Sequence, residues 1–322
     1  MPSVRLIDLK TGLPVDFPIP SNFVLALGNF DGVHLAHRAL LTATVKKAAS
    51  LDACLSAVFC FDPPSSDYLA RSGGEHLSTL QEKLDIFATC GIEYAFLADF
   101  PSLRDMTAEQ FIQQILRKMC RAKAVVCGFN FRFGQGGKGD AAMLTEAFGT
   151  HYTEIIAPYS VQLPNQTEAT VVSSTQIRTA LRQGEVEAAR LMLGQPYAIT
   201  ASVVHGKQLG RKLGIPTINQ YAPEGKLLPA AGIYITRAKI GERWFGGVSN
   251  VGVHPTVDKQ AALNCETHLL GFSGDLYGKS LTVAFLHRLR DERQFSSLSE
   301  LCARIAEDAK EANAWILANG QS

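Results

Sequence analysis

Two histidines three residues apart, His34 and His37, have the spacing in this 322-residue chain that most directly suggests chemistry. They follow the run LALGNFDGV, in which a buried strand ends in a turn containing Gly28 and Gly32 and a helix begins near His34. Side chains three apart project from one side of a helical turn, and free N–H groups at a helix start attract phosphate. A cationic histidine there is disfavoured by the helix dipole unless an anion compensates it. The segment therefore predicts a site for a polyphosphate.

A second segment combines a basic, glycine-rich stretch with oxygen ligands. HGKQLGRKLGIPTIN, residues 205–219, contains three glycines and three lysines or arginines and ends in Pro-Thr-x-Asn. Such a stretch can wrap the phosphates of a nucleotide, while Thr217 and Asn219 offer oxygen atoms suited to Mg²⁺. The alternative is an exposed basic turn without a ligand.

Glu266 is a candidate general base for the same site. In a strand, alternate side chains point to opposite faces, which places Glu266 with His268 on one face and Cys265, Thr267 and Leu269 on the other. The carboxylate can then face a pocket while its neighbours fill a core, and it could accept a proton from a hydroxyl substrate. The alternative is a glutamate on a solvated face of the sheet.

The elements that hold the histidines alternate between short apolar runs and helical patterns from Phe23 to about Pro158, which predicts a parallel sheet covered by helices. A capping-box spacing at residues 107–110 precedes an amphipathic helix, and Gly184 separates two further short helices, at residues 174–182 and 185–193. The expected strands are residues 23–27, 55–61, 94–98, 124–127 and 152–157. The expected core stripe of the amphipathic helix is Phe111, Ile112, Ile115, Leu116 and Met119.

After Gly194 the pattern changes to several short strands in about 100 residues, which predicts a small closed barrel. The tail, residues 297–317, is helical in pattern, and its apolar stripe is expected to pack on that barrel. We expect two domains, residues 1–184 and 185–322. The expected barrel strands are residues 197–204, 232–240, 243–251, 264–270 and 281–287. The expected stripe of the tail helix is Leu298, Leu301, Ile305 and Ala309.

The composition narrows the function classes. Lys+Arg 31 against Asp+Glu 30 leaves a formal charge of +1, so no broad basic field favours nucleic acid or a membrane surface as partner. The start MPSVRLIDLK lacks an apolar segment and no 18 consecutive apolar residues occur, which favours the cytoplasm. Seven scattered cysteines without a CxxC pair predict reduced, mostly buried thiols. The sequence carries no indication of oligomeric state.

The first half resembles a known family. GNFDGVHLAH is similar to the signature of the nucleotidyltransferase superfamily, in particular of prokaryotic bifunctional FAD synthetases, and GFNFRFG and SSTQIR follow in family order. The resemblance implies a Rossmann-like domain in an α/β fold that transfers AMP from ATP to FMN. It implies that His34 and His37 stabilise the transferred phosphoryl group and that Asn29 holds a phosphate. The implied phosphate contacts are Gly28, Phe30, Asp31, Gly32, Ser174, Thr175 and Arg178, and the implied flavin contacts are Asn130, Phe131, Arg132 and Phe133.

The second half is similar to riboflavin kinase through six ordered motifs, which include the loop at residues 205–219, GGVSNVGVHPTV, CETHLL and DLYGK. The resemblance implies a six-stranded Greek-key barrel with a C-terminal helix that binds ATP, Mg²⁺ and riboflavin. It implies Glu266 as the base and Thr217 and Asn219 as metal ligands. The implied ATP contacts are Gly206, Gly210, Arg211 and Gly214, and the implied flavin contacts are Asn250 and Arg290.

The leading interpretation is a bifunctional transferase that makes FMN from riboflavin and FAD from FMN. Three departures from the family pattern keep alternatives open: Ala36 replaces a glycine between the histidines, the run FDPPS replaces a Pro-His-Pro, and His254 replaces an arginine. The last could make flavin affinity depend on pH, because histidine titrates near neutrality. The alternatives are a riboflavin kinase whose first domain is inactive, and a flavin-binding protein without turnover.

Overall fold

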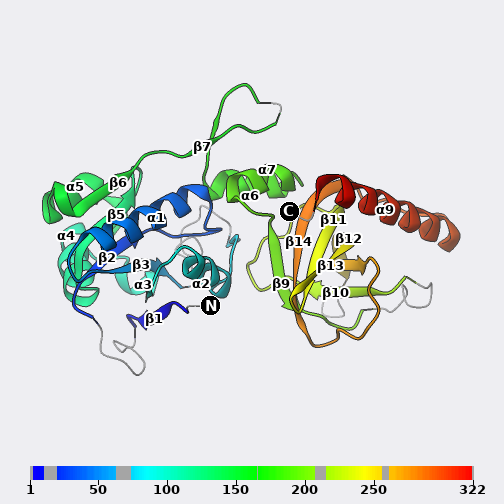
Figure 1. Ribbon diagram of the computed structural model, residues 1–322, viewed down its shortest axis with the longest axis horizontal. Helices are drawn as coiled ribbons and strands as arrows, with labels where there is room; N and C mark the ends of the chain where they lie inside the picture. The colour runs from blue at the N-terminus through cyan, green and yellow to red at the C-terminus, as the bar shows by residue number, and fades with distance from the viewer. Residues whose placement is uncertain are drawn as a thin grey trace. The chain divides into compact units, whose positions relative to one another are not determined.

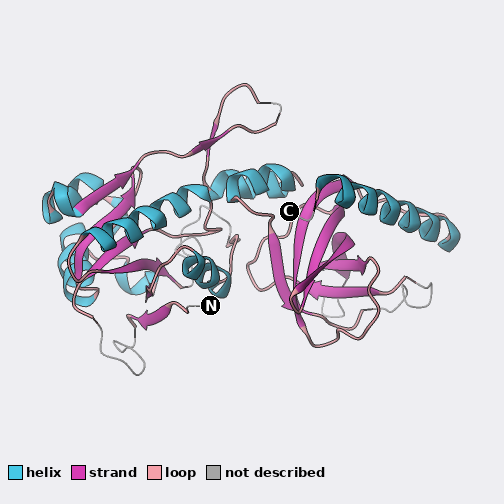
Figure 2. Cartoon of the chain, viewed as in Figure 1, coloured by secondary structure: helices cyan, strands magenta, loops and turns pink. Residues whose placement is uncertain are grey.

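The computed structural model describes residues 3–10, 20–62, 74–164, 166–206, 215–255 and 261–320. The chain forms two compact units, Met1–Ser174 and Thr175–Ser322. Figure 1 labels the elements of both units, and Figure 2 separates helices from strands by colour.

The first unit is built on a six-stranded sheet in the order β1-β4-β3-β2-β5-β6, in which every neighbouring pair is parallel (Figure 1). This confirms the predicted parallel sheet. Three strands begin and end where the pattern placed them, while β1 was not predicted. The elements are β1 (Arg5–Asp8), β2 (Phe23–Leu27), α1 (Leu35–Ser50), β3 (Leu55–Phe61), α2 (Leu80–Thr89), β4 (Tyr94–Ala98), α3 (Phe100–Leu103), α4 (Ala108–Gln110), η2 (Phe111–Met119), β5 (Ala122–Gly128), η3 (Gln135–Gly137), α5 (Ala141–Phe148), η4 (Thr150–Tyr152), β6 (Thr153–Ile156), β7 (Ser160–Val161) and β8 (Thr170–Val171).

Two apolar clusters lie on opposite faces of this sheet. Phe23 and Leu25 of β2 face the cluster that holds the buried side of η2 and Leu144 of α5. Val24 and Ala26, one residue out of step, face the cluster that includes α1 and Phe87 of α2. Because successive side chains of a strand point to opposite faces, a strand buried on both sides reads as the continuous apolar run that β2 has. The unit is therefore a three-layer α/β domain.

The segment predicted as an amphipathic α-helix is a π-helix, in which the Cys120 amide donates to the carbonyl of Ile115, five residues earlier. The capping box that precedes it, at Thr107 and Gln110, is present as predicted. Four of the five residues of the predicted stripe are buried, but Met119 is 37% exposed. The stripe prediction is corrected at that residue.

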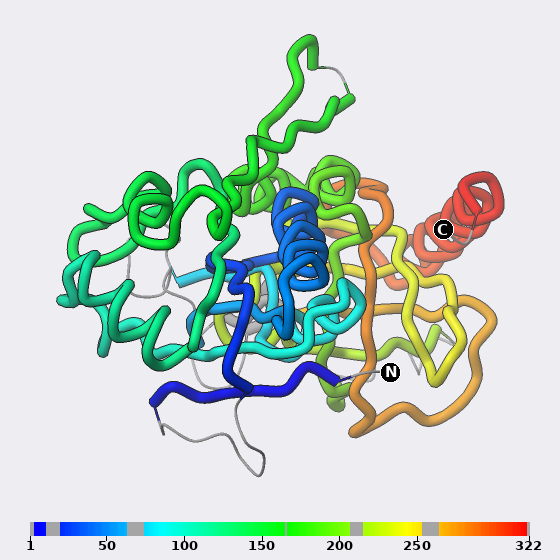
Figure 3. Tube along the Cα trace, turned by 60° about the vertical axis from the view of Figure 1, so that its left-hand side comes forward, coloured from blue at the N-terminus to red at the C-terminus, as the bar shows by residue number. Residues whose placement is uncertain are grey.

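A two-stranded hairpin, β7 with β8, leaves the body of the first unit as a narrow arm, which Figure 3 shows from a second direction. Most of its side chains are exposed. It joins the sheet to helix α6 (Ser174–Arg182).

The second unit is an antiparallel sheet in the order β10-β13-β12-β11-β14-β9. Strands β11, β12 and β13 follow one another as hairpins, and β14 returns to lie beside β11, which is the Greek-key order. The Val204 amide donates to the Asn219 carbonyl at 2.8 Å, and this link between the end strands nearly closes the barrel. The elements are α6 (Ser174–Arg182), α7 (Val186–Leu193), β9 (Ala198–Ser202), β10 (Thr217–Tyr221), β11 (Gly232–Ile240), β12 (Arg243–Pro255), β13 (Ala261–Leu269), β14 (Ser280–Arg290) and α9 (Leu298–Asn319).

The inside of the barrel holds a chain of buried hydroxyls as well as apolar side chains. The Oγ atom of Ser249 lies 2.7 Å from Oγ1 of Thr236 and 2.7 Å from Oγ1 of Thr267. These bonds satisfy polar groups that have no access to water. Cys265 and Thr267 are buried while Glu266 is partly exposed, so the predicted alternation along β13 is confirmed.

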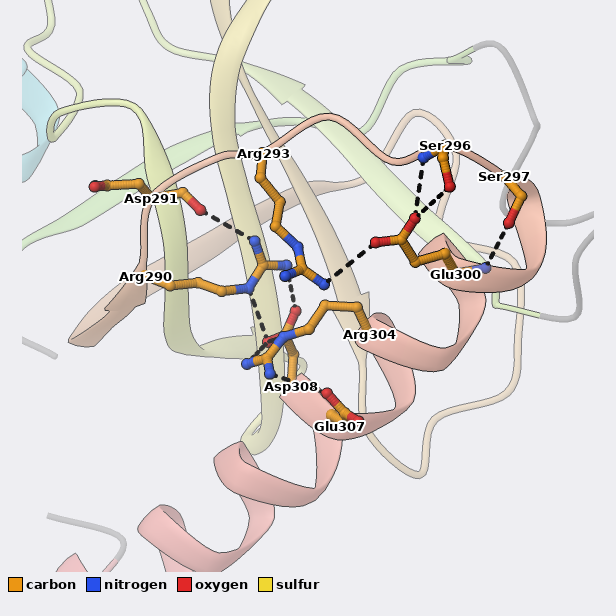
Figure 4. A network of polar contacts seen from close by, with 9 residues as sticks. All are labelled: Arg290, Asp291, Arg293, Ser296, Ser297, Glu300, Arg304, Glu307 and Asp308. Atoms are coloured by element: carbon orange, nitrogen blue, oxygen red, sulfur yellow. Dashed lines mark hydrogen bonds and ion pairs between the residues drawn. The ribbon is translucent and has the colours of Figure 1, made fainter.

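Charged side chains join helix α9 to the barrel in a network of polar contacts (Figure 4). Asp308 is 1% exposed and accepts hydrogen bonds from Arg290 Nε at 3.1 Å and Nη2 at 2.6 Å, and from Arg304 Nε at 2.9 Å. Farther along the helix, Ala312 is buried in the cluster that covers the barrel. The predicted apolar stripe is corrected at Leu298, which is 55% exposed, whereas Leu301, Ile305 and Ala309 are half-buried. The packed side also carries the buried carboxylate of Asp308.

Asp308 gives a first testable prediction. Replacing it by asparagine leaves the guanidinium groups of Arg290 and Arg304 without their shared anion, and breaking a buried ion pair from one side costs about 3–5 kcal/mol. We expect the Asp308→Asn variant to lose that much stability in urea unfolding of the second unit. Glu307→Gln is the matched control, because Glu307 has a 60% exposed side chain and, among the described residues, forms an ion pair only with Arg304. Equal stability of the two variants would contradict the assignment of Asp308 as the anchor of α9.

Candidate active sites

The phosphate-binding turn predicted after β2 is strained and tightly supported. Phe30 and Val33 have positive φ values of 50° and 38°, which non-glycine residues rarely adopt. A Cβ on Gly28 would lie 3.2 Å from the ring of Phe30, so a larger residue would push against that buried ring. Backbone strain persists only where the surroundings enforce it, and it concentrates at functional sites.

Asp31 is the residue that enforces this turn. Its Oδ1 accepts hydrogen bonds from the amides of Leu77 at 2.8 Å and Ser78 at 3.2 Å, and Ser78 Oγ in turn accepts from the Gly32 amide at 2.9 Å. Ser174 Oγ donates to the Asp31 carbonyl at 2.9 Å. The family resemblance implies that Asp31 contacts phosphate. In the structure, its side chain holds the turn to the segment at Leu77 and Ser78. Phe30 likewise has a fully buried ring, which leaves only its backbone for a ligand.

The two histidines stand together at the start of α1, as their spacing predicts. His34 is the N-cap, its Nδ1 accepts a hydrogen bond from the His37 amide at 3.3 Å, and the two rings stack with centroids 3.6 Å apart. Since Nδ1 of His34 is an acceptor, the ring proton of its neutral form is on Nε2. Burial lowers the pKa of His34 to about 4, against a smaller opposing effect of Asp31. Burial, His34 and Lys83 together lower the pKa of His37 well below its ordinary value.

Both imidazoles are therefore neutral at pH 7, and they can donate hydrogen bonds to a phosphate without carrying charge. Two polar atoms nearby have no hydrogen-bond partner among the described residues: Oδ1 of Asn29 and Nδ1 of His37 are both buried. Buried polar atoms are normally satisfied by a ligand or water when protein groups do not serve. Asn29 and His37, two of the predicted catalytic residues, can therefore each form a further hydrogen bond at the turn.

A pH dependence of stability follows from His34. The unfolded chain takes up a proton below the ordinary pKa of 6.5, whereas the folded chain resists it down to about 4. Stability is therefore unaffected by His34 above pH 6.5 and is lost as the pH falls from 6.5 toward 4, by up to roughly 3 kcal/mol. We expect His34→Asn, which keeps an N-cap side chain, to lose less stability over that range in chemical unfolding. His151→Asn, at an exposed site, should retain the full slope.

The motif after β5 lies beside this turn. The chain runs from β2 to β3 and β4 on one side and places β5 and β6 on the other, so β2 and β5 are neighbours at the point where the strand order reverses. Ligands of open α/β sheets bind outside the carboxyl ends of the strands at such a point. GNFDGVHLAH follows β2 and GFNFRFG follows β5, so the fold brings the two predicted motifs to one edge.

The predicted flavin residues of GFNFRFG divide into exposed and buried ones. Asn130 is exposed, Arg132 pairs with Asp140 at 3.3 Å, and Phe131 is half-buried. Phe133 is 7% exposed and packs against Phe111 with ring centroids 5.4 Å apart, so the structure places it in the core.

Phe129 lies in the same motif but is not among the predicted flavin contacts. It is 51% exposed and follows the last residue of β5. Its position directly after the end of β5 was the feature of the sequence that could have indicated its exposure.

Thr175 and Arg178 belong to α6 in the second unit, and their role toward ATP stays a prediction.

The second site lies on the barrel. Strand β13 runs between β10 and β12, and its Glu266 stands opposite Asn219 on one side and Asn250 on the other. Thr217 Oγ1 donates to Glu266 Oε1 at 2.6 Å. The structure thus brings the predicted base, the two predicted metal ligands and a predicted flavin contact onto one surface. Asn264, which was not predicted as a site residue, donates a hydrogen bond from Nδ2 to Oδ1 of Asn219 at 3.3 Å.

Thr217 and Asn219 line a cavity of about 440 Å³, whose walls come from three of the motifs. Thr217 and Asn219 form one wall, and the loop that ends in Asp275 and Tyr277 forms another. Gly206 also lines the cavity, and a Cβ there would come within 2.5 Å of the Asn219 side chain, which would have to move. Gly210, Arg211 and Gly214 lie outside the described residues, as does the side chain of His254.

Two further polar features bear on the barrel site. Oδ1 of Asn250 is buried and has no hydrogen-bond partner in the described part of the chain, which leaves it available to a ligand. Arg290, predicted to contact flavin, has Nε and Nη2 bonded to Asp308 and Nη1 bonded to the Asp291 carbonyl. Its observed task is to anchor α9, and its contact with flavin stays a prediction.

A three-layer domain with the turn predicted to bind phosphate at its switch point is followed by a small barrel, in which the predicted metal ligands line a cavity and Thr217 bonds to the predicted base. This architecture is that of a two-domain nucleotide-dependent transferase. Two family models match this chain, FAD synthetase over residues 17–176 and riboflavin kinase over residues 193–316. The chain belongs to the family of bifunctional riboflavin kinase/FMN adenylyltransferases.

Relatives of that name match along most of the chain. The one from Escherichia coli K12 is 36% identical over 88% of this chain and 90% of its own length. The one from Bacillus subtilis is 32% identical over 90% and 91%. A solved structure described as a macrolide-efflux protein from Streptococcus pneumoniae is 29% identical, covers 97% of this chain and 100% of its own, and has a TM-score of 0.84. Across the described residues, no helix is both long and apolar enough to cross a membrane.

Proposed function

We propose that this chain makes FAD in two steps, phosphorylation of riboflavin by ATP in the barrel and adenylylation of FMN by ATP in the α/β domain. The observation that carries the proposal is the pairing across strands that sets Glu266 beside Thr217 and Asn219 at a cavity. We assign residues 1–184 to the adenylyltransferase and residues 185–322 to the kinase. A cytoplasmic location fits the need of both steps for ATP.

In the kinase step the terminal ribityl hydroxyl of riboflavin attacks the γ-phosphorus of ATP. The new P–O bond forms as the bond to the bridging oxygen breaks, ADP leaves, and Glu266 accepts the hydroxyl proton. The hydroxyl of Thr217 and the amide oxygen of Asn219 are hard ligands at the cavity wall, which fits Mg²⁺. When bound, that ion neutralises charge on the phosphates.

In the adenylyl step a phosphate oxygen of FMN attacks the α-phosphorus of ATP and pyrophosphate leaves. The attacking phosphate is already an anion, so this step has no need of a general base. The domain has to align the two anions and stabilise charge, for which the neutral histidines and Asn29 offer hydrogen bonds at a preformed turn.

The alternatives of a kinase with an inactive first domain and of a flavin carrier without turnover lack support from the family matches. Both family models are present, and the relatives named bifunctional align with both halves. Ala36 is the second residue of α1 and does not interrupt that helix.

The test is a time course with riboflavin, ATP and Mg²⁺, in which riboflavin, FMN and FAD are separated by chromatography. We expect FMN first and FAD after it. FMN that accumulates without FAD would support the kinase alone, and no product would support a binding protein.

A further inference from the structure

Lys83 is a buried cation at the adenylyltransferase site that no motif of the sequence marks. It lies in α2 and is 1% exposed, whereas lysines are almost never fully buried unless they are paired. Its Nζ donates to the carbonyl of Asn29 at 3.4 Å, and among the described residues it forms no ion pair with a carboxylate. Within the described ranges, the fold therefore places a positive charge next to the predicted phosphate site without a carboxylate partner.

The position of Lys83 is fixed by the same contacts that hold the phosphate-binding turn. The segment before α2 is bonded through Leu77 and Ser78 to Asp31, and a capping box of Thr79 and Glu82 then starts the helix. This places the ammonium group of Lys83 beside Asn29, in the turn that follows the end of β2.

One turn farther along α2, Phe87 packs edge-on against the ring of Phe30 at 5.4 Å, on the face of the helix that carries Lys83. This contact between Phe87 and Phe30 holds α2 at a fixed distance from the turn. The ammonium is therefore preorganised before a ligand arrives.

The charges of the groups around Lys83 indicate a role for its ammonium group. His34 and His37 are neutral at pH 7, and the ammonium lies near enough to His37 to contribute to the low pKa of that ring. The carboxylate of Asp31 accepts hydrogen bonds from the backbone amides of Leu77 and Ser78. A polyphosphate bound at the histidines would bring several negative charges close to the buried ammonium group of Lys83.

We propose that Lys83 binds the polyphosphate of ATP in the first unit and stabilises the charge that develops on pyrophosphate as it leaves. The inference rests on the proposed adenylyltransferase activity. A competing explanation is that Lys83 serves the fold alone, by donating to the Asn29 carbonyl. The two differ in what happens to the ligand-free protein, because a buried charge without an anion destabilises it, whereas a purely structural bond stabilises it.

The experiment compares Lys83→Met, which keeps the length of the side chain and removes its charge, with the parent protein and with Lys46→Met. Lys46 is exposed on α1 of the same unit and serves as the matched control. Three quantities are measured: FAD formation from FMN and ATP, FMN formation from riboflavin and ATP, and the rise in melting temperature caused by inorganic pyrophosphate. Pyrophosphate is the probe because it lacks the adenosine that the kinase site would also bind.

We expect Lys83→Met to lower FAD formation at least about 100-fold, the order of effect seen when one preorganised electrostatic donor is removed. FMN formation should stay within twofold, the ligand-free melting temperature should not fall, and the pyrophosphate-dependent rise should disappear. FAD formation within threefold of the parent, or a retained pyrophosphate response, would overturn the proposal. A lower ligand-free melting temperature with unchanged pyrophosphate response would assign Lys83 to the fold. If the parent protein makes no FAD yet loses its pyrophosphate response in Lys83→Met, the proposed function fails while the anion site stands.

Discussion

Replacing Glu266 by glutamine is expected to remove FMN formation and to leave conversion of FMN to FAD intact. Glutamine keeps the size of the side chain and an oxygen that can accept the hydrogen bond from Thr217, which is 2.6 Å long. It cannot take up the proton of the ribityl hydroxyl. A positioned general base contributes about 10²–10⁴-fold, so we expect kcat of the kinase step to fall by that factor.

The two half-reactions are measured separately, with riboflavin and ATP for the first and FMN and ATP for the second. Glu242→Gln is the matched control, because Glu242 lies in the same unit with a 94% exposed side chain and should leave both rates unchanged. Equal loss of both activities in Glu266→Gln would contradict two independent sites. An unchanged rate of FMN formation would remove Glu266 from the role of base.

Replacing His37 by alanine is expected to do the reverse. The ring stacks on His34 at 3.6 Å, and its Nδ1 is a buried atom without a partner among the described residues, so the fold holds it ready for a ligand. Loss of one preorganised donor from an electrostatic site costs about 10²–10³-fold in kcat. We expect FAD formation to fall by that factor while FMN formation continues at the parental rate.

FAD formation is followed by chromatography with FMN and ATP, and FMN formation by the parallel assay with riboflavin. His151→Ala is the control, since His151 is exposed in the same unit. A melting curve of each variant separates loss of catalysis from loss of fold. Full FAD formation by a folded His37→Ala would show that the histidine pair is not part of the chemistry.

Features set by the period of one strand or helix were predictable from the sequence. Strand β2 begins at Phe23 and ends at Leu27 as expected, and the histidines share the first turn of α1. Along β13 the alternation separates Glu266 from the buried Cys265. These features depend on neighbours within a few residues, whose relative directions are the same in every strand or helix.

The burial of Phe133 could not be predicted from the sequence. An aromatic residue in a glycine-rich loop has the composition of a ligand contact, and the motif placed it with the flavin. The structure shows that Phe133 packs against Phe111 in the core, while Phe129 is 51% exposed, and the flavin contact of Phe133 stays a prediction. The π-helix at residues 111–119 is a second case, because its apolar stripe has the spacing of an α-helix. Residue type alone does not tell which side of a loop or helix faces the core.

By itself, the sequence determined the two domains' classes, the order of their motifs and the local faces on which the candidate catalytic side chains lie. Only the tertiary structure decided which distant residues meet. Thr217 and Glu266 are 49 positions apart and bond because β10 and β13 pair in one register, and Lys83 reaches Asn29 across 54 positions because α2 is held to the turn. Arg290 binds Asp308 through the docking of α9. Register and docking depend on the summed packing of whole elements, which no local spacing encodes.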